Sequence, residues 1–533
     1  MPHFFVRLPG YWLCLLAFAA SGCASRHYFQ SDARIGPGST AALPATADTV
    51  RATAGRHYNR HSRFYYLFWG RHYRRVWAAP IAAPVLQMAT ATPGGLHAGK
   101  PGGGYQSIST TLNGTQGRKY ALRTLDKEPS KTLPKVLRHS FVLNVVRDAT
   151  SAAIPYGALT VPALAQAVGV PHAHPHLVYV RPDETGLGPI SEHFQGKLAL
   201  LEEKYEALAS RTPDLANATS FIGSEAMLKK IYDRPYCTID QPAFLRARLL
   251  DVWLGDWDRH EGQWQWAVFK TPNGRVRYLA IPKDRDQVYF RFDDGFVPWL
   301  ASRPFIAPQF QTFKPRYGYV PGLVFQAGFI DQRGLSQMTR VDFQHLAADL
   351  QRRLPDTLIE RALHYLPPAV FALEGPRIIA ALKARRQTLP KAAAAFYQTL
   401  ARTPVLGGTA QPERFVVHRY PDSTTVRVFS SVLNQLNPGD SLQFRRTYFT
   451  PETRELTLEG LGGDDVFEIV TTGTGRPTRL LVYGGPGRDQ LHLQGSGRRL
   501  KRFDEAADLA ATGMHGPHLP KKKRRAYDRL NDK

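Results

Sequence analysis

The chain has 533 residues, 43% of them hydrophobic, and its 69 lysines and arginines against 44 aspartates and glutamates give a formal net charge of +25 at pH 7. This length is sufficient for two to four domains with cores of their own. Three scattered cysteines exclude a disulfide framework and a four-ligand zinc site. The positive charge is spread along the chain without a nucleic-acid-binding motif, so we expect an anionic membrane surface or a phosphate-bearing ligand rather than DNA or RNA.

Residues 1–23 have the pattern of a secretory signal peptide, with a basic residue, an apolar stretch over 11–20 and then Ser-Gly-Cys23. Small residues directly before a cysteine resemble the bacterial lipoprotein signal. The resemblance implies that Cys23 carries a lipid, which anchors the protein to a membrane of the cell envelope. The alternative is an ordinary cleaved signal in which Cys23 has no role. Residues 24–55, rich in Ala, Ser, Thr, Gly and Pro, are predicted to form a flexible tether.

Residues 56–100 form an N-terminal extension that begins with a dense block of aromatic and basic side chains. We expect an amphipathic helix that packs its aromatic residues on the next domain; a role at a lipid interface or in stacking on bases is the alternative.

Two alternating runs around Asn113-Gly114 predict a β-hairpin over 105–125.

Further along the chain the periodicity of apolar residues changes several times. It predicts helices over 133–153 and 244–253. Residues 341–401 are predicted to be largely helical, with interruptions at Pro355, Pro367 and Pro390. Short alternating strands over 405–500 predict a separate β domain. A basic tail follows over 501–533.

The most informative segment follows the predicted helix 244–253. It contains Asp258 and, five residues later, the amide of Gln263, and a predicted strand then leads to Asp284 and Asp286. Phosphoryl transfer requires an acidic side chain that orients the attacking hydroxyl, and carboxylates with an amide that hold Mg²⁺. These groups in this order predict a phosphotransfer site.

The segment resembles the atypical branch of the protein-kinase-like fold, which includes bacterial toxin-type, spore-coat and secretory-pathway kinases and has a catalytic loop of the form Asp-x-His-x-x-Asn or a variant. The resemblance implies that Asp258 is the catalytic base and that His260 is a structural residue of the catalytic loop. It also implies that Gln263 holds the metal where the family has asparagine. Asp286 would be the magnesium aspartate, with Asp284 as the alternative.

The segment before this loop resembles the small lobe of the same family. Arg123 stands where the phosphate-binding lysine is expected, and Lys127 is the alternative cation. Asp148, the only acidic residue within 133–153, is the expected partner of that cation. The hairpin would cover the phosphates of a nucleotide with its turn residues Asn113, Gly114 and Gly117.

The wider pattern, including Gly255-Asp-Trp-Asp-Arg-His260 and Ile281-Pro-Lys-Asp-Arg-Asp-Gln287, is similar to a group of cell-envelope proteins from the Bacteroidetes lineage. In that group such a region often precedes an outer-membrane β-barrel. The resemblance therefore implies an envelope location, and we expect that the protein either lacks such a barrel or pairs with a separate outer-membrane β-barrel protein.

Two glycine-aspartate segments in the predicted β domain, 461–467 and 483–491, are partial copies of the repeat that binds calcium in parallel β-rolls. Asp464, Asp465 and Asp489 are the candidate calcium ligands, together with turn carbonyls. The alternative is that these aspartates cap tight glycine turns without a metal.

Together these patterns predict an α+β protein with a two-lobed kinase-like core over 101–400 and a small all-β, β-roll-like C-terminal domain. We expect it to bind ATP or a related nucleotide with Mg²⁺ or Mn²⁺ and to transfer phosphate to a protein, lipid or glycan. The alternative function is a catalytically inactive scaffold that binds an envelope or outer-membrane partner. Phosphotransfer requires that Asp258 and Asp286 meet Arg123 or Lys127 in one cleft. If these side chains point apart, the scaffold is favoured.

Overall fold

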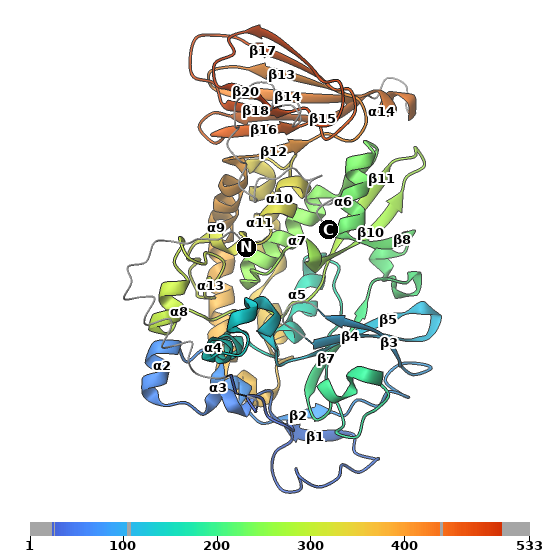
Figure 1. Ribbon diagram of the computed structural model, residues 1–533, viewed down its shortest axis with the longest axis vertical. Coiled ribbons are helices and arrows are strands. Elements are labelled where there is room, and N and C mark those ends of the chain that lie inside the picture. Colours follow the sequence, from blue (N-terminus) through green and yellow to red (C-terminus); the bar gives the residue numbers. More distant parts are fainter. Residues whose placement is uncertain (1–23, 26, 104–107, 437–440, 504–533) are drawn as a thin grey trace.

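The computed structural model describes residues 24–25, 27–103, 108–436 and 441–503. The predicted signal peptide with Cys23 and nearly all of the predicted basic tail lie outside these residues. Figure 1 shows three tiers along the long axis: a region with two sheets, a mainly helical middle, and a β domain at the opposite end. The mixed α+β class predicted from the sequence is confirmed.

The first large sheet has five antiparallel strands in the order β3-β4-β5-β7-β6. β4 and β5 form the predicted hairpin, with Asn113 opposite Lys119, so that the turn spans 114–118. Alternating apolar residues such as Leu112 and Leu122 bury one face of the sheet. Its strands are β3 (His97–Gly103), β4 (Ile108–Asn113), β5 (Lys119–Thr124), β6 (His176–Tyr179) and β7 (Leu198–Lys204).

The helix predicted over 133–153 is shorter in the structure. α4 (Phe141–Asp148) begins after Ser140, whose hydroxyl accepts the N–H of Val142, because a serine side chain satisfies a backbone donor at a helix N-terminus. Short 3-10 turns precede and follow α4. α5 (Val161–Ala167) comes next in the chain.

The predicted flexible tether over 24–55 is instead partly built into the fold. β1 (Thr49–Ala52) pairs antiparallel with β2 (Ile81–Pro84). Ala33 and Ala52 are buried, and the Ala33 N–H donates to the Gly196 carbonyl at 2.7 Å. Small side chains are often buried as well as being common in linkers, so the composition of this segment was compatible with packing.

The aromatic and basic block forms two short helices instead of one amphipathic helix: α2 (Arg63–Trp69) and α3 (Arg74–Trp77). Gly70 separates them with a φ of +86°, a left-handed conformation that favours glycine. Trp77 is buried, and its indole N–H donates to the Ala153 carbonyl at 2.9 Å. α2, by contrast, contains no buried residue.

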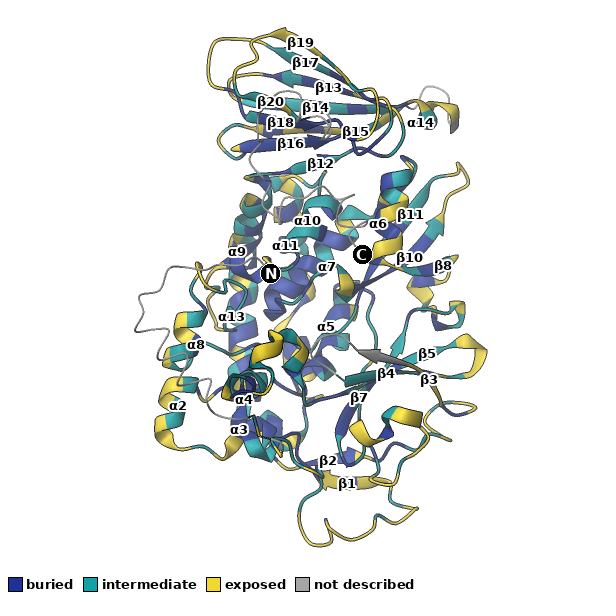
Figure 2. Cartoon of the chain, viewed as in Figure 1, coloured by how far each residue is buried: buried dark blue, intermediate teal, exposed yellow. Residues whose placement is uncertain are grey.

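A second sheet and the helix predicted over 244–253 form the centre of the molecule. α7 (Gln241–Leu254) begins at Asp240, whose side chain accepts the Ala243 N–H, and ends at Gly255 with a φ of +72°. From Leu249 to Leu254 every residue of α7 is buried, as the dark blue of this helix in Figure 2 shows. The sheet has the order β8-β10-β11-β9, and α6 connects β8 to β9 along the chain. These elements are β8 (Ser220–Gly223), α6 (Ser224–Asp233), β9 (Cys237–Ile239), β10 (Trp264–Lys270) and β11 (Val276–Pro282).

The helices after β11 complete the middle tier. α13 runs for 34 residues through Pro376 and Pro390. The interruption that we expected at Pro390 is therefore absent. α13 packs against α7 and α11, and these contacts stabilise the helix despite the proline. None of the helices that the structure describes has the length and apolarity needed to cross a bilayer. The helices are α8 (Phe296–Ala301), α9 (Val320–Leu323), α10 (Gly328–Gly334), α11 (Arg340–Arg353), α12 (Asp356–Leu363) and α13 (Pro368–Ala401).

Residues 405–503 form two further sheets, which the chain enters alternately. β12, β16, β18 and β20 are parallel in one sheet, while β13, β17 and β19 are parallel in the other, which β14 and β15 extend in antiparallel fashion. This alternation is the winding of a β-roll, and apolar residues such as Phe415 and Leu456 fill the space between its sheets. The elements are β12 (Val405–Gly407), β13 (Glu413–Arg419), β14 (Ser423–Ser430), α14 (Ser431–Leu436), β15 (Leu442–Phe449), β16 (Glu455–Glu459), β17 (Val466–Thr471), β18 (Arg479–Tyr483), β19 (Gln490–Gly495) and β20 (Leu500–Phe503).

A buried charge network holds α7 to α10 and to the loops after α7 and β11. Arg248 donates to Asp331 at 2.7 and 3.0 Å and to Asp251 at 2.7 Å. The network contains three guanidinium groups and three carboxylates, so its formal charges balance: Arg248, Arg259, Arg285, Asp251, Asp256 and Asp331. Removing one partner from such a buried set leaves an uncompensated charge away from water.

We therefore expect Asp331→Ala to lower the free energy of unfolding by about 3–5 kcal/mol, because Arg248 stays buried with too few partners. Asp183→Ala removes an ion pair with Arg181 in which the aspartate is mostly exposed, and it should cost less than about 1 kcal/mol. Urea denaturation followed by circular dichroism measures both losses. Two equally small losses would contradict a structural role for the network.

Candidate functional site

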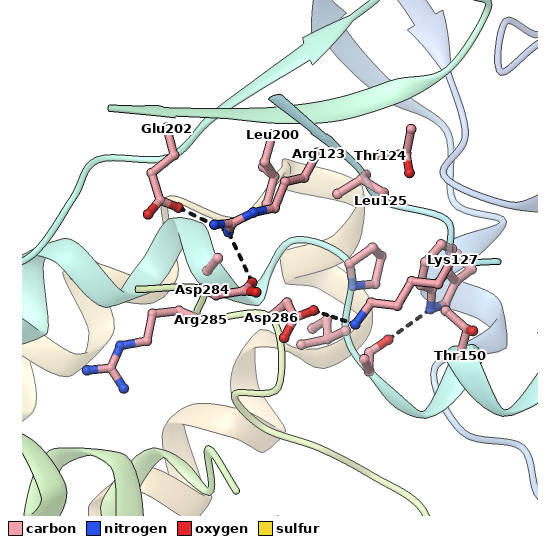
Figure 3. A pocket seen from close by; sticks show the side chains of 15 residues that line it. Arg123, Thr124, Leu125, Lys127, Thr150, Leu200, Glu202, Asp284, Arg285 and Asp286 are labelled. Atoms are coloured by element: carbon pink, nitrogen blue, oxygen red, sulfur yellow. Dashed lines mark hydrogen bonds and ion pairs between the residues drawn. The ribbon is translucent and has the colours of Figure 1, made fainter. Parts of the chain in front are cut away.

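Charged residues from distant parts of the chain meet where the five-stranded sheet faces the loop after β11. β5 and the residues after it carry Arg123 and Lys127, β7 carries Glu202, and the loop after β11 carries Asp284 and Asp286. All five line one pocket, and Figure 3 shows their side chains turned toward one another. Lys127 and Asp286, which form an ion pair there, are 159 positions apart in the sequence.

Arg123 connects the sheet to the loop after β11. Its Nη1 lies 3.1 Å from Asp284 Oδ1 and 3.9 Å from Glu202 Oε2 (Figure 3). Burial alone would raise the pKa of Asp284, but the cations Arg123 and Lys127 outweigh burial and hold that pKa below its usual value. Asp284 therefore stays ionised.

Lys127 and Asp286 form a direct ion pair in the same pocket. Burial and the neighbouring Asp284 carboxylate raise the pKa of Asp286, and Lys127 compensates for this only in part. The ionised form of Asp286 would therefore gain from a further positive charge, such as a metal ion.

Asp258 lies in the loop 256–263 between α7 and β10. Within the ranges that the structure describes, its carboxylate has neither a hydrogen bond nor an ion pair. Burial, and after it the Asp286 carboxylate, raise the pKa of Asp258 to about 6. An unpaired carboxylate with a pKa near neutrality is suited to accept a proton from a hydroxyl group.

Arg259 fixes the two acidic loops to each other, although the sequence analysis gave it no role. Its buried guanidinium donates to the carbonyls of Gln263 at 3.0 Å, Lys283 at 2.7 Å and Asp284 at 3.2 Å. Asp284 has a φ of +55°, which is uncommon for a residue other than glycine, and two of these bonds hold the backbone on either side of it. The available signal was an arginine within an otherwise apolar and acidic segment, because a buried arginine must be paired.

Gln263 and His260 lie on the same loop as Asp258. Gln263 Nε2 is 3.4 Å from Asp284 Oδ2, so the amide faces the loop after β11. His260 Nδ1 accepts the N–H of Gly262 at 3.0 Å and caps the short turn Glu261–Gln263. The imidazole therefore stabilises the loop backbone.

Asp148 does not take the position expected for it. Its carboxylate is bound by Arg74 Nη2 at 2.6 Å and by the Tyr65 hydroxyl at 3.0 Å. The acidic partners of Arg123 and Lys127 come instead from β7 and from the loop after β11. The prediction that Asp148 pairs with the pocket cations is therefore wrong. Asp148 is the last residue of α4 and faces Arg74 on α3, and the sequence pattern did not indicate that Arg74 is buried.

The hairpin turn is also distant from the cation that it was expected to accompany. Arg123 is four residues along β5 from Lys119, which pairs with Asn113 beside the turn, a separation of about 13 Å at the rise of a β-strand. The turn residues do not line the pocket described above. In this arrangement Asn113, Gly114 and Gly117 do not cover the pocket, contrary to the expectation that they would cover a bound phosphate.

The pocket between the ion pairs has a volume of about 40 Å³, which is room for about three water molecules. Pockets for drug-sized ligands have roughly 300–1,000 Å³, so the pocket in this arrangement is too small for a nucleotide. Within the described residues, no three His, Cys, Asp or Glu side chains are arranged as a metal site. The donor chemistry nevertheless suits Mg²⁺, which binds carboxylate and amide oxygens; these donors are Asp258, Gln263, Asp284 and Asp286.

The three aspartates predicted as calcium ligands lie in stacked turns of the β-roll. Asp489 Oδ1 accepts the Asp465 N–H at 3.1 Å, and Asp465 Oδ1 accepts the Glu413 N–H at 2.9 Å. Asp464 Oδ1 accepts the Arg488 N–H at 2.9 Å. Each carboxylate thus caps the backbone of another turn, and Glu413, which the sequence analysis missed, belongs to the same row through its bonds to Thr409.

No protein-family profile and no curated protein sequence matches this chain. Among solved structures, the chain is similar to a chain of the toxin–antitoxin complex of HipA, HipB and operator DNA from Shewanella oneidensis MR-1. The two sequences are 13% identical, the alignment covers 66% of this chain and 73% of that chain, and the TM-score is 0.24. At this TM-score the similarity does not establish a common fold.

The turn carboxylates of the β-roll lead to a prediction about pH. Asp465 Oδ2 is buried without a hydrogen bond among the described residues, and burial raises the pKa of this carboxyl from 3.8 to about 9. Between these two values the folded state keeps a proton that the unfolded state has lost, so the stability of the protein falls as the pH rises. Asp465→Asn keeps the hydrogen-bond acceptor and cannot titrate, so it should raise the melting temperature more at pH 8 than at pH 5.

Thermal unfolding of both proteins at these pH values, with calcium and with a calcium chelator, tests this prediction. An effect of Asp465→Asn that does not vary with pH would contradict a protonated cap. A stabilisation by calcium that the substitution abolishes would contradict it as well and would support the calcium site.

Proposed function

We propose that the pocket between β5, β7 and the loop after β11 binds a nucleoside triphosphate with Mg²⁺, and that the protein transfers its terminal phosphoryl group to a hydroxyl of a protein, lipid or glycan. Residues 101–400 would then form an atypical kinase-like domain. One observation carries the proposal. The unpaired Asp258 carboxylate, with a pKa of about 6, lies within electrostatic reach of Lys127, Asp284 and Asp286.

The order of the elements supports this proposal. In protein kinases the cation that binds the phosphates lies on the third strand of the small sheet, and an aspartate and a catalytic-loop asparagine hold the magnesium ions. Here Arg123 lies on β5, the third strand of the five-stranded sheet in chain order, and Gln263 and Asp286 lie on the loops after α7 and β11. Two departures are arginine in place of lysine and glutamine in place of asparagine.

Residues that line the pocket and two residues of the neighbouring loop 256–263, Asp258 and Gln263, would divide the chemistry among them. Arg123 and Lys127 bind phosphate oxygens in place of Asp284 and Asp286. Asp258 accepts the proton of the acceptor hydroxyl as that oxygen bonds to the terminal phosphorus, while the bond from this phosphorus to the bridging oxygen breaks and the nucleoside diphosphate leaves. Asp284, Asp286 and Gln263 would hold Mg²⁺, which would supply charge neutralisation on the phosphates.

A binding-only scaffold is the second candidate, and the closed pocket favours it. The volume of about 40 Å³ between the ion pairs is far below that of a nucleotide site. Asp148, the only acidic residue of α4, is engaged with Arg74 and not with the pocket cations. In this case the acidic loops would serve the fold alone, and the surface would bind an envelope or outer-membrane partner.

We place this activity at the bacterial cell envelope, with a lipid on Cys23 as the anchor. The support for this location is the sequence of residues 11–23 and the resemblance to envelope proteins. Because ATP is scarce outside the cytoplasm, other phosphate donors belong in the test.

We expect a magnesium nucleotide to raise the melting temperature of the full chain in mild detergent. A ligand that binds only the folded state stabilises it by about 2.7 kcal/mol at 100 times its Kd. Asp286→Asn and Lys127→Met should abolish the shift, whereas Asp183→Asn, at an exposed position, should keep it. The panel contains ATP, GTP and polyphosphate with Mg²⁺ or Mn²⁺. A cooperative transition that none of them shifts would contradict nucleotide binding and support the scaffold.

Phosphoryl transfer from the donor found in this panel should rise about tenfold per pH unit below pH 6 and level off above pH 7. The reason is that Asp258 accepts a proton only when it is ionised, and its pKa is about 6. Asp258→Asn should lower the rate by about 10²- to 10⁴-fold while the nucleotide-induced melting shift remains. Rates with a radiolabelled donor between pH 5 and 8 measure this. A fully active Asp258→Asn protein would refute the assignment of the base.

A further inference from the structure

Two short helices that lie side by side, α2 and α8, each expose three large apolar side chains. α2 exposes Phe64 (71%), Leu67 (65%) and Phe68, and α8 exposes Phe296, Trp299 and Leu300. Figure 1 shows α2 and α8 adjacent on one side of the molecule, and the rings of Phe68 and Phe296 are 6.2 Å apart in an edge-on contact. We call these six residues the α2–α8 patch. Contiguous exposed apolar surface of this kind marks an interaction site.

The two helices are held in a fixed relation by their backbones. A β-carbon at Gly295 would lie 2.2 Å from the backbone nitrogen of Gly70, so only glycine permits this approach of the two segments. Behind it, the His72 N–H donates to Asp294 Oδ2 at 2.8 Å. The patch is therefore a preformed surface, and its exposure does not arise from a loose helix.

More basic than acidic residues accompany the patch. Segments 56–77 and 296–316 together contain eight arginines, one lysine and no aspartate or glutamate. Arg74 is buried and paired with Asp148, so it does not contribute to the charge of this surface. Arg303 stacks on Trp299, with its guanidinium carbon 4.5 Å from the ring centre. The acidic residues that precede α8 are already paired, Asp293 with Lys314 at 2.6 Å and Asp294 with Arg291 at 3.0 Å. The surface around the patch therefore carries an excess of positive charge.

We propose that the α2–α8 patch is a membrane-docking surface that inserts its aromatic and aliphatic side chains into the interface of an anionic lipid bilayer. Trp and Phe prefer the boundary between lipid headgroups and acyl chains, and arginines beside them attract anionic headgroups. After α8 the chain continues with Phe305 (80% exposed) and Ile306 (52% exposed), which enlarge the apolar surface. Docking would hold the body of the protein against the membrane at a second point, in addition to the lipid expected on Cys23.

The path of the N-terminal segment agrees with this orientation. The Ala24 N–H donates to the His139 carbonyl at 2.8 Å, directly before α4. α4 and α2 are connected through the bond from the Tyr65 hydroxyl to Asp148, and Figure 1 shows both helices on the same side of the molecule as α8. A lipid at the neighbouring position 23 would thus reach the same membrane that the patch contacts.

An environment-sensitive fluorophore on the full chain tests the proposal. We attach nitrobenzoxadiazole to a cysteine introduced as Phe64→Cys and, as a control, to one introduced as Phe449→Cys, which is 53% exposed on β15 of the β domain. The probes are vesicles of phosphatidylcholine alone and vesicles with one quarter phosphatidylglycerol. We expect the label at position 64 to brighten at least twofold and shift to the blue with anionic vesicles, and to respond less to neutral ones. The label at position 449 should not change.

The design separates docking from tethering, because a protein held only by its N-terminal lipid would leave both labels in water. Equal responses at the two positions, or none at position 64, would overturn the proposal. A response at position 64 that grows with protein concentration in the absence of vesicles would also overturn it, since the patch would then bind a second copy of the chain. Introducing Leu67→Gln and Trp299→Gln into the Phe64→Cys protein should remove the vesicle response while the melting temperature stays within about 2 °C, because both side chains are exposed.

Discussion

The buried guanidinium of Arg259 is the interaction on which the arrangement of the middle tier depends. It cannot be left unpaired away from water, and its partners are the carboxylates of α7 and the next loop together with three backbone carbonyls of the acidic loops. These bonds determine where the loop after α7 ends and how the loop after β11 turns. The relative positions of Asp258, Asp284 and Asp286 follow from them, so the charges that fold the protein also position its candidate site.

The pocket itself is a balance of opposite charges in a small volume. Its lining holds Arg123 and Lys127 together with the carboxylates of Glu202, Asp284 and Asp286. Asp258 lies outside this lining, on the neighbouring loop 256–263, and keeps a raised pKa. Because the ion-paired side chains lie so close together, they fill most of the pocket themselves. The same arrangement of charges is therefore compatible with either of the two candidate functions, phosphoryl transfer or a scaffold.

Local patterns predicted the elements whose formation depends on neighbouring residues. The hairpin over β4 and β5 follows from alternation around Asn113-Gly114, and α7 follows from the apolar pattern over 244–253. The structure ends α7 at Gly255, whose left-handed backbone conformation favours glycine. The same reasoning failed for segments whose state depends on distant partners. Residues 24–55 pack partly into the core because β2 and Gly196 receive them, and Asp148 turns to Arg74, whose burial no local pattern reveals.

The sequence by itself determined the chemistry available to this protein: the acidic loop residues, the cations of the sheet, the glycine-aspartate turns and the basic, aromatic N-terminal block are all readable from residue type and spacing. Only the tertiary structure decided which of these groups meet. It paired Lys127 with Asp286 and Arg123 with Asp284, aligned Glu413 with the turn aspartates, and placed α2 beside α8. The physical reason is that electrostatic and apolar contacts act through space over a few ångströms, whereas sequence patterns report only neighbours along the chain.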